Sequence, residues 1–174
     1  MKNVLVMDSP LGALQLSADG DALAGVHFLD AASPASAIAA ATPLLRRAQA
    51  QLQAYFRGDA VAFDLPLRPQ GTPFQLAVWV ALQTVPAGQT ISYATLAQRL
   101  GLPGTHARAV GAAVGRNPLL IIVPCHRIIG HDGRLTGYAA GLPRKQALLD
   151  LERVAPISTQ SPTQTPTPRR PRAA

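Results

Sequence analysis

The chain has 174 residues, of which 48% are hydrophobic, and its formal net charge is +7 at pH 7. This length fits one domain or two small ones, and this hydrophobic fraction is too high for a disordered protein. The single cysteine, Cys125, can form neither an internal disulfide nor a thiolate zinc cage by itself. The sequence has no apolar stretch long enough for a membrane span and no signal-peptide core. We therefore expect a cytoplasmic protein with no membrane partner.

The charge is unevenly distributed along the chain. Residues 1–66 contain four basic and six acidic residues, residues 67–152 contain eight and three, and residues 153–174 contain four basic residues and no acidic one. A basic middle segment suits a polyanionic partner, with DNA or RNA preferred because no basic, lipid-binding helix accompanies it. The same excess is expected of a protein from an Arg-rich proteome, so the charge alone leaves both interpretations open.

The first part of the chain predicts a small sheet followed by a helix. Residues 3–28 alternate short apolar runs with turn-forming Ser-Pro and Asp-Gly pairs, which is typical of a three-stranded antiparallel meander. Apolar residues at three- and four-residue spacings predict a helix over residues 35–56, which Gly58 ends. Pro66 and Pro69 then mark a linker.

Capping residues predict three short helices after this linker. Thr72 caps a helix over residues 74–85, and Ser92 caps a second over residues 93–100. Thr105 caps a third, with the sequence "HARAVGAAVG". Because the second and third helices are joined by "GLPGT", they form a candidate helix-turn-helix.

The third of these helices has unusually small side chains. Its backbone could approach another surface closely, as in a recognition helix for a DNA groove, although tight packing in a core is the commoner use of such residues. Arg108, in its first turn, would be costly to bury without a partner and so favours the DNA-facing alternative. The small residues are Ala107, Ala109, Gly111, Ala112 and Ala113.

A candidate reactive group lies in the apolar run "IIVPCHRIIG" at residues 121–130. Cys125 is followed by His126, and a final helix over residues 143–153 carries Glu152 on the same face as two leucines. A carboxylate on a packed face needs a partner, and an imidazole held by a carboxylate can remove a thiol proton. The alternative is that Cys125 is a small buried hydrophobe and that Glu152 reaches solvent. On the residues alone, the second alternative is the commoner one.

Five motifs in this order closely resemble one family, the O6-alkylguanine-DNA alkyltransferases, also called methylated-DNA-protein-cysteine methyltransferases. The resemblance covers residues 71–152, whereas the N-terminal third resembles the family only in layout. The motifs are "GTPFQLAVWVAL" at 71–82, "ISYATLAQRLG" at 91–101, "RAVGAAVGRNP" at 108–118, "PCHRII" at 124–129 and "LTGYAAGLPRKQALLDLE" at 135–152.

The implied fold is α+β, in two domains with a linker and a tail. Residues 1–66 form a small α/β domain, a ribonuclease H-like antiparallel meander plus helix, and residues 67–70 form the linker. Residues 71–153 form a mostly helical domain with a winged-helix-like helix-turn-helix, which holds the DNA-binding and alkyl-acceptor groups. Residues 154–174, basic and rich in Pro and Thr, are expected to be disordered.

The resemblance implies DNA repair by stoichiometric transfer of an alkyl group from O6-alkylguanine, and O4-alkylthymine, in double-stranded DNA to Cys125. The resulting thioether has no good leaving group, so the protein is inactivated irreversibly. His126, acting through a water and oriented by Glu152, resembles the base. Tyr93 resembles the tyrosine that protonates guanine N3, and Asn117 resembles the asparagine that braces the active-site turn. We expect no cofactor and no metal.

Further residues are carried over as DNA contacts and as the wall of the base pocket. Arg108 resembles the finger that enters the base stack when the damaged nucleotide is flipped out. The remaining expected DNA contacts are Thr72, Ser92, Ala107, Gly111 and Arg116, and the expected pocket residues are Tyr138, Ala139, Val114 and Val123. Ala139 and Ala140 stand where relatives often have a serine or glycine pair, which leaves the accepted alkyl group open. We expect a monomer, with cooperativity on DNA left open, associated with the nucleoid if the source is bacterial.

Three other classes of protein fit the sequence less well. A relative that senses alkylated bases without repairing them would lack the acceptor thiol of Cys125. A two-part adaptive-response regulator would need an additional zinc module with several cysteines. A cysteine hydrolase uses the same Cys-His-carboxylate arrangement. However, it would catalyse many turnovers and would not need a helix-turn-helix.

Overall fold

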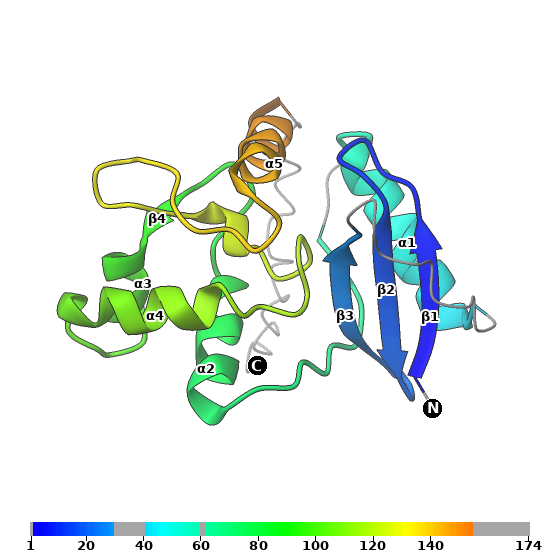
Figure 1. Ribbon diagram of the computed structural model, residues 1–174, viewed down its shortest axis with the longest axis horizontal. Coiled ribbons are helices and arrows are strands. Elements are labelled where there is room, and N and C mark those ends of the chain that lie inside the picture. The colour runs from blue at the N-terminus through cyan, green and yellow to red at the C-terminus, as the bar shows by residue number, and fades with distance from the viewer. Residues whose placement is uncertain (1, 30–40, 60–61, 155–174) are drawn as a thin grey trace, which may run out of the picture.

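A computed structural model describes residues 2–29, 41–59 and 62–154 of the chain. Figure 1 shows a sheet and one helix forming one part of the molecule and a group of helices forming the other, with the last helix above and between them. Buried apolar side chains from both parts belong to one continuous core cluster. No helix in the described ranges is long and apolar enough to cross a membrane. Of the expected disordered tail, residue 154 ends the last helix and residues 155–174 lie outside the described residues.

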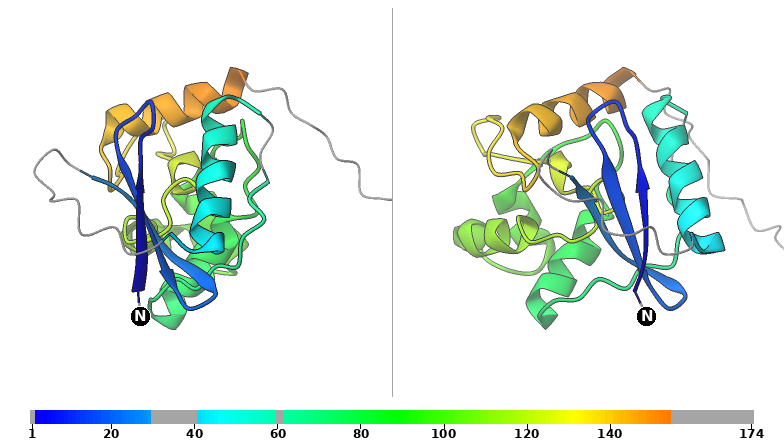
Figure 2. Two further views of the ribbon diagram at one scale, coloured as in Figure 1. Left: turned by 90° about the vertical axis from the view of Figure 1, so that its right-hand side faces the viewer. Right: turned by 45° about the vertical axis from the view of Figure 1, so that its right-hand side comes forward.

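The sheet is the predicted antiparallel meander. Its strands are β1 (Lys2–Met7), β2 (Leu14–Asp19) and β3 (Ala22–Phe28), in the order β1-β2-β3. Along β2, buried and half-buried residues alternate, so that Leu14, Leu16 and Ala18 point into the core. Figure 2 shows α1 (Pro43–Phe56) lying along the sheet.

Helix α1 begins later than predicted. The backbone of Thr42 is extended, and its Oγ1 accepts a hydrogen bond from the N–H of Leu45 at 3.3 Å, so Thr42 is the N-cap and Pro43 the first helical residue. The predicted start at residue 35 lies outside the described residues, but residues 41 and 42 are described and are not helical. Periodicity in an alanine-rich run cannot locate a helix start, whereas a Thr-Pro cap can.

The edge of β3 is covered by two distant segments. Leu23 forms a parallel bridge with Leu67, and Val26 forms one with Leu119. The N–H of Val26 also donates to the carbonyl of Pro118 at 2.8 Å. The first residue of the expected linker and the segment that precedes Cys125 are therefore both hydrogen-bonded to the sheet.

Two of the predicted caps begin helices in the second part of the chain. Helix α2 (Pro73–Leu82) has a capping box, in which Thr72 Oγ1 accepts from Gln75 N and Gln75 Oε1 accepts from Thr72 N. The helix ends before Val85, where it was predicted to end. Helix α3 (Tyr93–Arg99) is capped by Ser92 Oγ, as predicted.

The prediction that Thr105 caps the third helix is wrong. Residues Gly104–His106 form a 3₁₀ turn, η1, and α4 (Ala107–Val114) follows it without any side-chain cap. The turn continues directly into the helix, so its own hydrogen bonds take the place of a cap. The last helix, α5 (Leu142–Val154), matches the predicted C-terminal helix to within one residue at each end.

Candidate active site

Cys125 lies in a short turn that leads directly into a strand. It begins the 3₁₀ turn η2 (Cys125–Arg127), and β5 (Ile128–Ile129) follows at once and pairs in parallel with β4 (Ile91–Ser92). Because Tyr93 directly follows β4, this pairing brings the start of α3 beside the turn. The two-residue strands were not predicted from the sequence.

Asn117 holds both the backbone of this turn and the sulfur. Its Nδ2 donates to the carbonyl of Val123 at 2.8 Å and to Sγ of Cys125 at 3.1 Å, while its Oδ1 accepts from the N–H of Leu119 at 3.0 Å. Between these points Ile121 has φ 72°, which is a strained conformation for a β-branched residue. The buried amide is therefore placed to maintain a tight bend next to the thiol.

His126 and Glu152 form a buried pair. Nε2 of His126 lies 2.8 Å from Oε1 of Glu152, and the two residues are 0% and 3% exposed. Burial alone would raise the pKa of Glu152, but hydrogen bonds from His126 and Arg127 more than offset it and hold this pKa well below its usual range. An ionised carboxylate accepts but cannot donate, so Nε2 of His126 carries the proton of this bond. Nδ1 is then left with its lone pair, and it makes no hydrogen bond to any residue in the described ranges.

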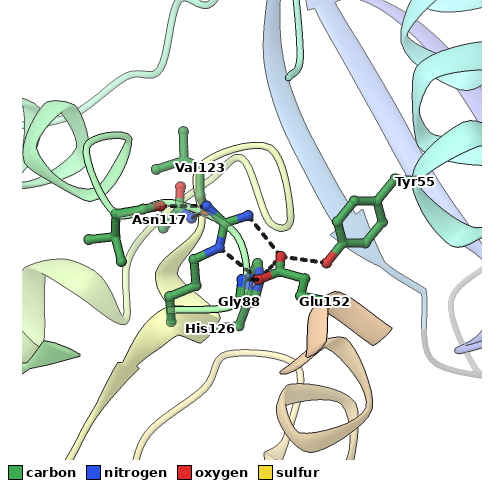
Figure 3. Close-up of polar contacts among 8 residues, drawn as sticks. Tyr55, Gly88, Asn117, Val123, His126 and Glu152 are labelled. Atoms are coloured by element: carbon green, nitrogen blue, oxygen red, sulfur yellow. Dashed lines mark hydrogen bonds and ion pairs between the residues drawn. The ribbon is translucent and has the colours of Figure 1, made fainter. Parts of the chain in front are cut away.

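Glu152 receives four further hydrogen bonds from three residues in widely separated parts of the chain (Figure 3). Arg127 binds it in a bidentate manner, with Nη2 2.8 Å from Oε1 and Nε 2.9 Å from Oε2. The N–H of Gly88 donates to Oε2 at 3.3 Å, and Oη of Tyr55 in α1 donates to Oε1 at 2.8 Å. The predicted packed face of α5 therefore does carry a paired carboxylate, but with more partners than His126 alone.

The thiol of Cys125 is protonated at neutral pH in this environment. Burial raises its pKa to about 11, while the hydrogen bond from Asn117 and the charge of Lys145 act in the opposite direction. Since the thiolate is the nucleophile, reaction requires that the proton be taken away. Burial lowers the pKa of His126, with Glu152 partly opposing the effect, so this imidazole is neutral and able to accept a proton near pH 7.

Lys145 is a fully buried cation in α5 that the sequence analysis did not identify. Its Nζ donates to the carbonyls of Ile128 at 2.5 Å and Thr136 at 2.7 Å, and Tyr93 Oη donates to the same Thr136 carbonyl at 3.0 Å. Burial lowers the pKa of Lys145 to about 8. In the sequence, its burial was indicated by its position seven residues before Glu152, which places both residues on the same helix face. Arg127 and Tyr55 were likewise not singled out as polar partners.

A cavity of about 440 Å³ lies beside Tyr93, between α3, η1, α4 and the loop after β5. It includes two of the expected DNA contacts, Ala107 and Gly111, but none of the four expected pocket residues. Of those four, Val114 and Val123 are buried in the core, Tyr138 is half-buried with its Oη enclosed, and Ala139 is exposed. The lining residues are Tyr93, Ala94, Gly104, Ala107, Gly111, Gly130 and His131.

The remaining expected DNA contacts lie on the surface or serve as caps. Arg108 and Arg116 are exposed, and Arg108 makes no hydrogen bond or ion pair with any residue that the structure describes. Thr72 and Ser92 use their side-chain oxygens to cap α2 and α3. Within the same described ranges, no group of three or more His, Cys, Asp or Glu side chains is arranged to hold a metal ion.

Both parts of the chain match models of one family. Residues 73–154 match the 6-O-methylguanine DNA methyltransferase DNA binding domain, and residues 5–69 match the ribonuclease-like domain of the same family. A methylated-DNA–protein-cysteine methyltransferase of Mycobacterium tuberculosis is 47% identical over 149 residues, which cover 84% of this chain and 90% of that protein. The N-terminal match goes beyond the layout resemblance noted in the sequence.

Solved structures agree with these matches. A crystal structure of M. tuberculosis O6-methylguanine methyltransferase superposes with a TM-score of 0.82 at 43% identity, covering 91% of this chain and 96% of that one. A crystal structure of M. tuberculosis OGT in complex with DNA gives a TM-score of 0.79 at 44% identity, covering 90% and 96%. The shared fold and these matches define the class as a methyltransferase that acts on 6-O-methylguanine DNA. The chain belongs to the 6-O-methylguanine DNA methyltransferase family.

Proposed function

We propose that this protein repairs alkylated double-stranded DNA by transferring the alkyl group of O6-alkylguanine, and of O4-alkylthymine, to Sγ of Cys125. The main support is the buried arrangement in which Asn117 donates to the sulfur while the adjacent His126 is paired with Glu152. This arrangement activates one thiol without a cofactor. Membership of the family supplies the substrate class, because its M. tuberculosis members are named for methylated DNA and one was solved with DNA.

In the proposed reaction, Sγ of Cys125 attacks the alkyl carbon, so that an S–C bond forms as the C–O6 bond breaks. The thiol proton passes through a bridging water to Nδ1 of His126, whose Nε2–H is held by Glu152. Tyr93 gives a proton to guanine N3, and the proton gained by His126 balances it, so guanine leaves as a neutral base. A thioether is not readily cleaved, and each protein molecule therefore acts once.

We propose that α3 and α4 bind the duplex and that the damaged nucleotide is flipped out toward Cys125, because a stacked base cannot be reached. The small residues Ala107 and Gly111 allow the backbone of α4 to approach DNA closely, and Arg108 fills the space left in the stack. The two-domain division at residues 67–70 and a monomeric state in solution belong to the same proposal. DNA is the substrate, so the site of action is the cytoplasm, at the nucleoid if the source is bacterial.

The test is to incubate the protein with duplex DNA that contains O6-methylguanine. We expect one methyl mass on the peptide that contains Cys125, and one methyl per protein at saturation, measured by mass spectrometry. Cys125→Ala should abolish transfer but still bind DNA, since phosphate contacts come from the helix-turn-helix and its basic surroundings. Multiple turnovers, as a cysteine hydrolase would give, or methylation of another residue would refute the proposal.

A further inference from the structure

Tyr55 connects the N-terminal part of the chain to the carboxylate of the candidate active site. It lies in α1, on the core-facing side, and its Oη donates to Oε1 of Glu152 at 2.8 Å across 97 residues of sequence. Figure 3 shows the ring of Tyr55 reaching from α1 toward Glu152 at the end of α5. Tyr55 is 5% exposed, so water does not readily replace this hydrogen bond.

The phenol and the imidazole share the same carboxylate oxygen. Oε1 of Glu152 lies 2.8 Å from Oη of Tyr55, 2.8 Å from Nη2 of Arg127 and 2.8 Å from Nε2 of His126. One carboxylate oxygen offers about two lone-pair directions, so these three donors compete for its electron density. Each of these hydrogen bonds therefore weakens the other two that Oε1 accepts. Tyr55 therefore moderates the bond between Glu152 and His126.

The donor role of Tyr55 is fixed by its surroundings. Burial, together with the charge of Glu152 and the hydrogen bond to it, raises the pKa of Tyr55 far above its usual range, so the phenol keeps its proton. The other titratable or charged groups that interact with Tyr55 or His126 come from the turn, the following loop and α5. They are Arg127, Tyr138 and Lys145.

We propose that Tyr55 is a positioning residue for alkyl transfer, which acts by sharing Oε1 of Glu152 with His126. Its hydrogen bond keeps the carboxylate oriented and limits how strongly Glu152 favours the protonated imidazole, so that Nδ1 stays free to accept the thiol proton. The N-terminal part then contributes to the chemistry as well as to packing. This inference rests on the proposed function, since the proton acceptor is defined by alkyl transfer from DNA.

The test is Tyr55→Phe, which removes one oxygen atom and keeps the ring. Without this donor, the carboxylate holds the imidazole proton more strongly, and the neutral base is depleted at low pH. The acidic limb of the rate of methyl transfer should therefore move upward by about one pH unit. Below the limb the rate should fall about tenfold, and above it the rate should equal that of the wild type.

The matched control is Thr42→Ala, which removes the N-cap of the same helix and does not touch Glu152. Loss of the cap loosens the start of α1, so any effect of general loosening appears in this variant too. Three outcomes would overturn the inference. They are a rate of methyl transfer in Tyr55→Phe that is lower by the same factor at every pH, a pH profile of Tyr55→Phe that equals that of the wild type, and an equal shift of the acidic limb in Thr42→Ala.

A second measurement needs neither DNA nor alkyl transfer. The ring nitrogens of His126 can be followed by ¹⁵N NMR as the pH is lowered, with thermal melting to verify that each variant is folded. We expect the imidazole to become protonated at a higher pH in Tyr55→Phe than in the wild type or in Thr42→Ala, and equal titration would refute the inference. Failure of the proposed function would look different, because wild-type Cys125 would then gain no methyl group.

Discussion

Arg108 is the residue at which a structural and a functional role predict opposite results. It is exposed, and it makes no hydrogen bond or ion pair within the part of the chain that the structure describes. Removing such a side chain should leave stability almost unchanged. Its position in the first turn of α4, near the cavity beside Tyr93, suits a side chain that enters DNA.

We predict that Arg108→Ala slows repair of duplex DNA without affecting the reaction with free O6-alkylguanine base. Flipping a base costs a few kcal/mol of unstacking, and each 1.4 kcal/mol corresponds to about tenfold in rate, so a decrease of about 10- to 100-fold is expected on the duplex. Both substrates and a melting curve should be measured on one preparation, with the exposed Arg46→Ala as the control. Equal losses on both substrates would make Arg108 an ordinary scaffold residue.

At the scale of single elements, α4 carries an interior glycine on the face that lines the cavity. Gly111 lies in the middle of this helix and lines the cavity, although glycine is unfavourable in a helix interior. A Cβ at this position would lie 3.5 Å from Cδ1 of Tyr93, which is an ordinary van der Waals contact. The glycine is therefore not required by the packing of the helix, and its absence of a side chain keeps the cavity open.

Gly111→Ala should therefore stabilise the protein and slow its reaction on DNA. The alanine should add about 0.5 to 1 kcal/mol, or about 1 to 4 °C in Tm, because it reduces the flexibility of the unfolded chain. Its methyl group narrows the cavity against Tyr93, so transfer from duplex DNA should become slower. Gly115→Ala, at the end of the same helix and outside the cavity, should not slow transfer. If Gly111→Ala were more stable than the wild type and transferred the methyl group equally fast, the open cavity would not be needed for transfer from duplex DNA.

The elements that were correctly predicted are those with a local physical cause. The meander follows from alternating apolar residues and turn pairs, and the starts of α2 and α3 follow from the side-chain oxygens of Thr72 and Ser92. The start of α1 was predicted too early, because periodicity continues through alanines whether or not they are helical. Thr105 was wrongly predicted to cap α4, because a 3₁₀ turn leads into this helix and no side chain makes a capping hydrogen bond there.

At the scale of the whole molecule, the site depends on contacts that no local pattern encodes. The pairing of His126 with Glu152 could be raised as a hypothesis, because a carboxylate on a packed helix face requires a partner, but only the family resemblance favoured it over a solvent-exposed Glu152. Tyr55 could not, since nothing in an amphipathic helix distinguishes a tyrosine that packs from one that also donates to a residue far along the chain. The resulting network joins α1, the turn at Cys125 and α5 through one buried carboxylate.

This network makes the stability of the whole protein depend on pH in the acidic range. The pKa of Glu152 is held below its ordinary value of 4.5 by His126 and Arg127 despite burial, and burial lowers the pKa of His126 below its ordinary value of 6.5. In both cases the unfolded chain binds the proton first as the pH falls. Their contribution to stability is therefore complete above pH 6.5. It is lost progressively as the pH falls through 6.5 for His126 and through 4.5 for Glu152.

We predict that the free energy of unfolding of the wild type falls between pH 7 and pH 4, by up to about 1.4 kcal/mol per pH unit for each extra proton bound by the unfolded chain. Glu152→Gln should be less stable at pH 7 by about 3 to 5 kcal/mol, because Arg127 then lies buried without a counter-ion. Its stability should also change less with pH. The measurement is urea unfolding at several pH values, with Asp64→Asn as the control, since its exposed pair with Arg47 contributes little. If Glu152→Gln kept the wild-type pH dependence, the acid sensitivity would have to come from carboxylates outside this network.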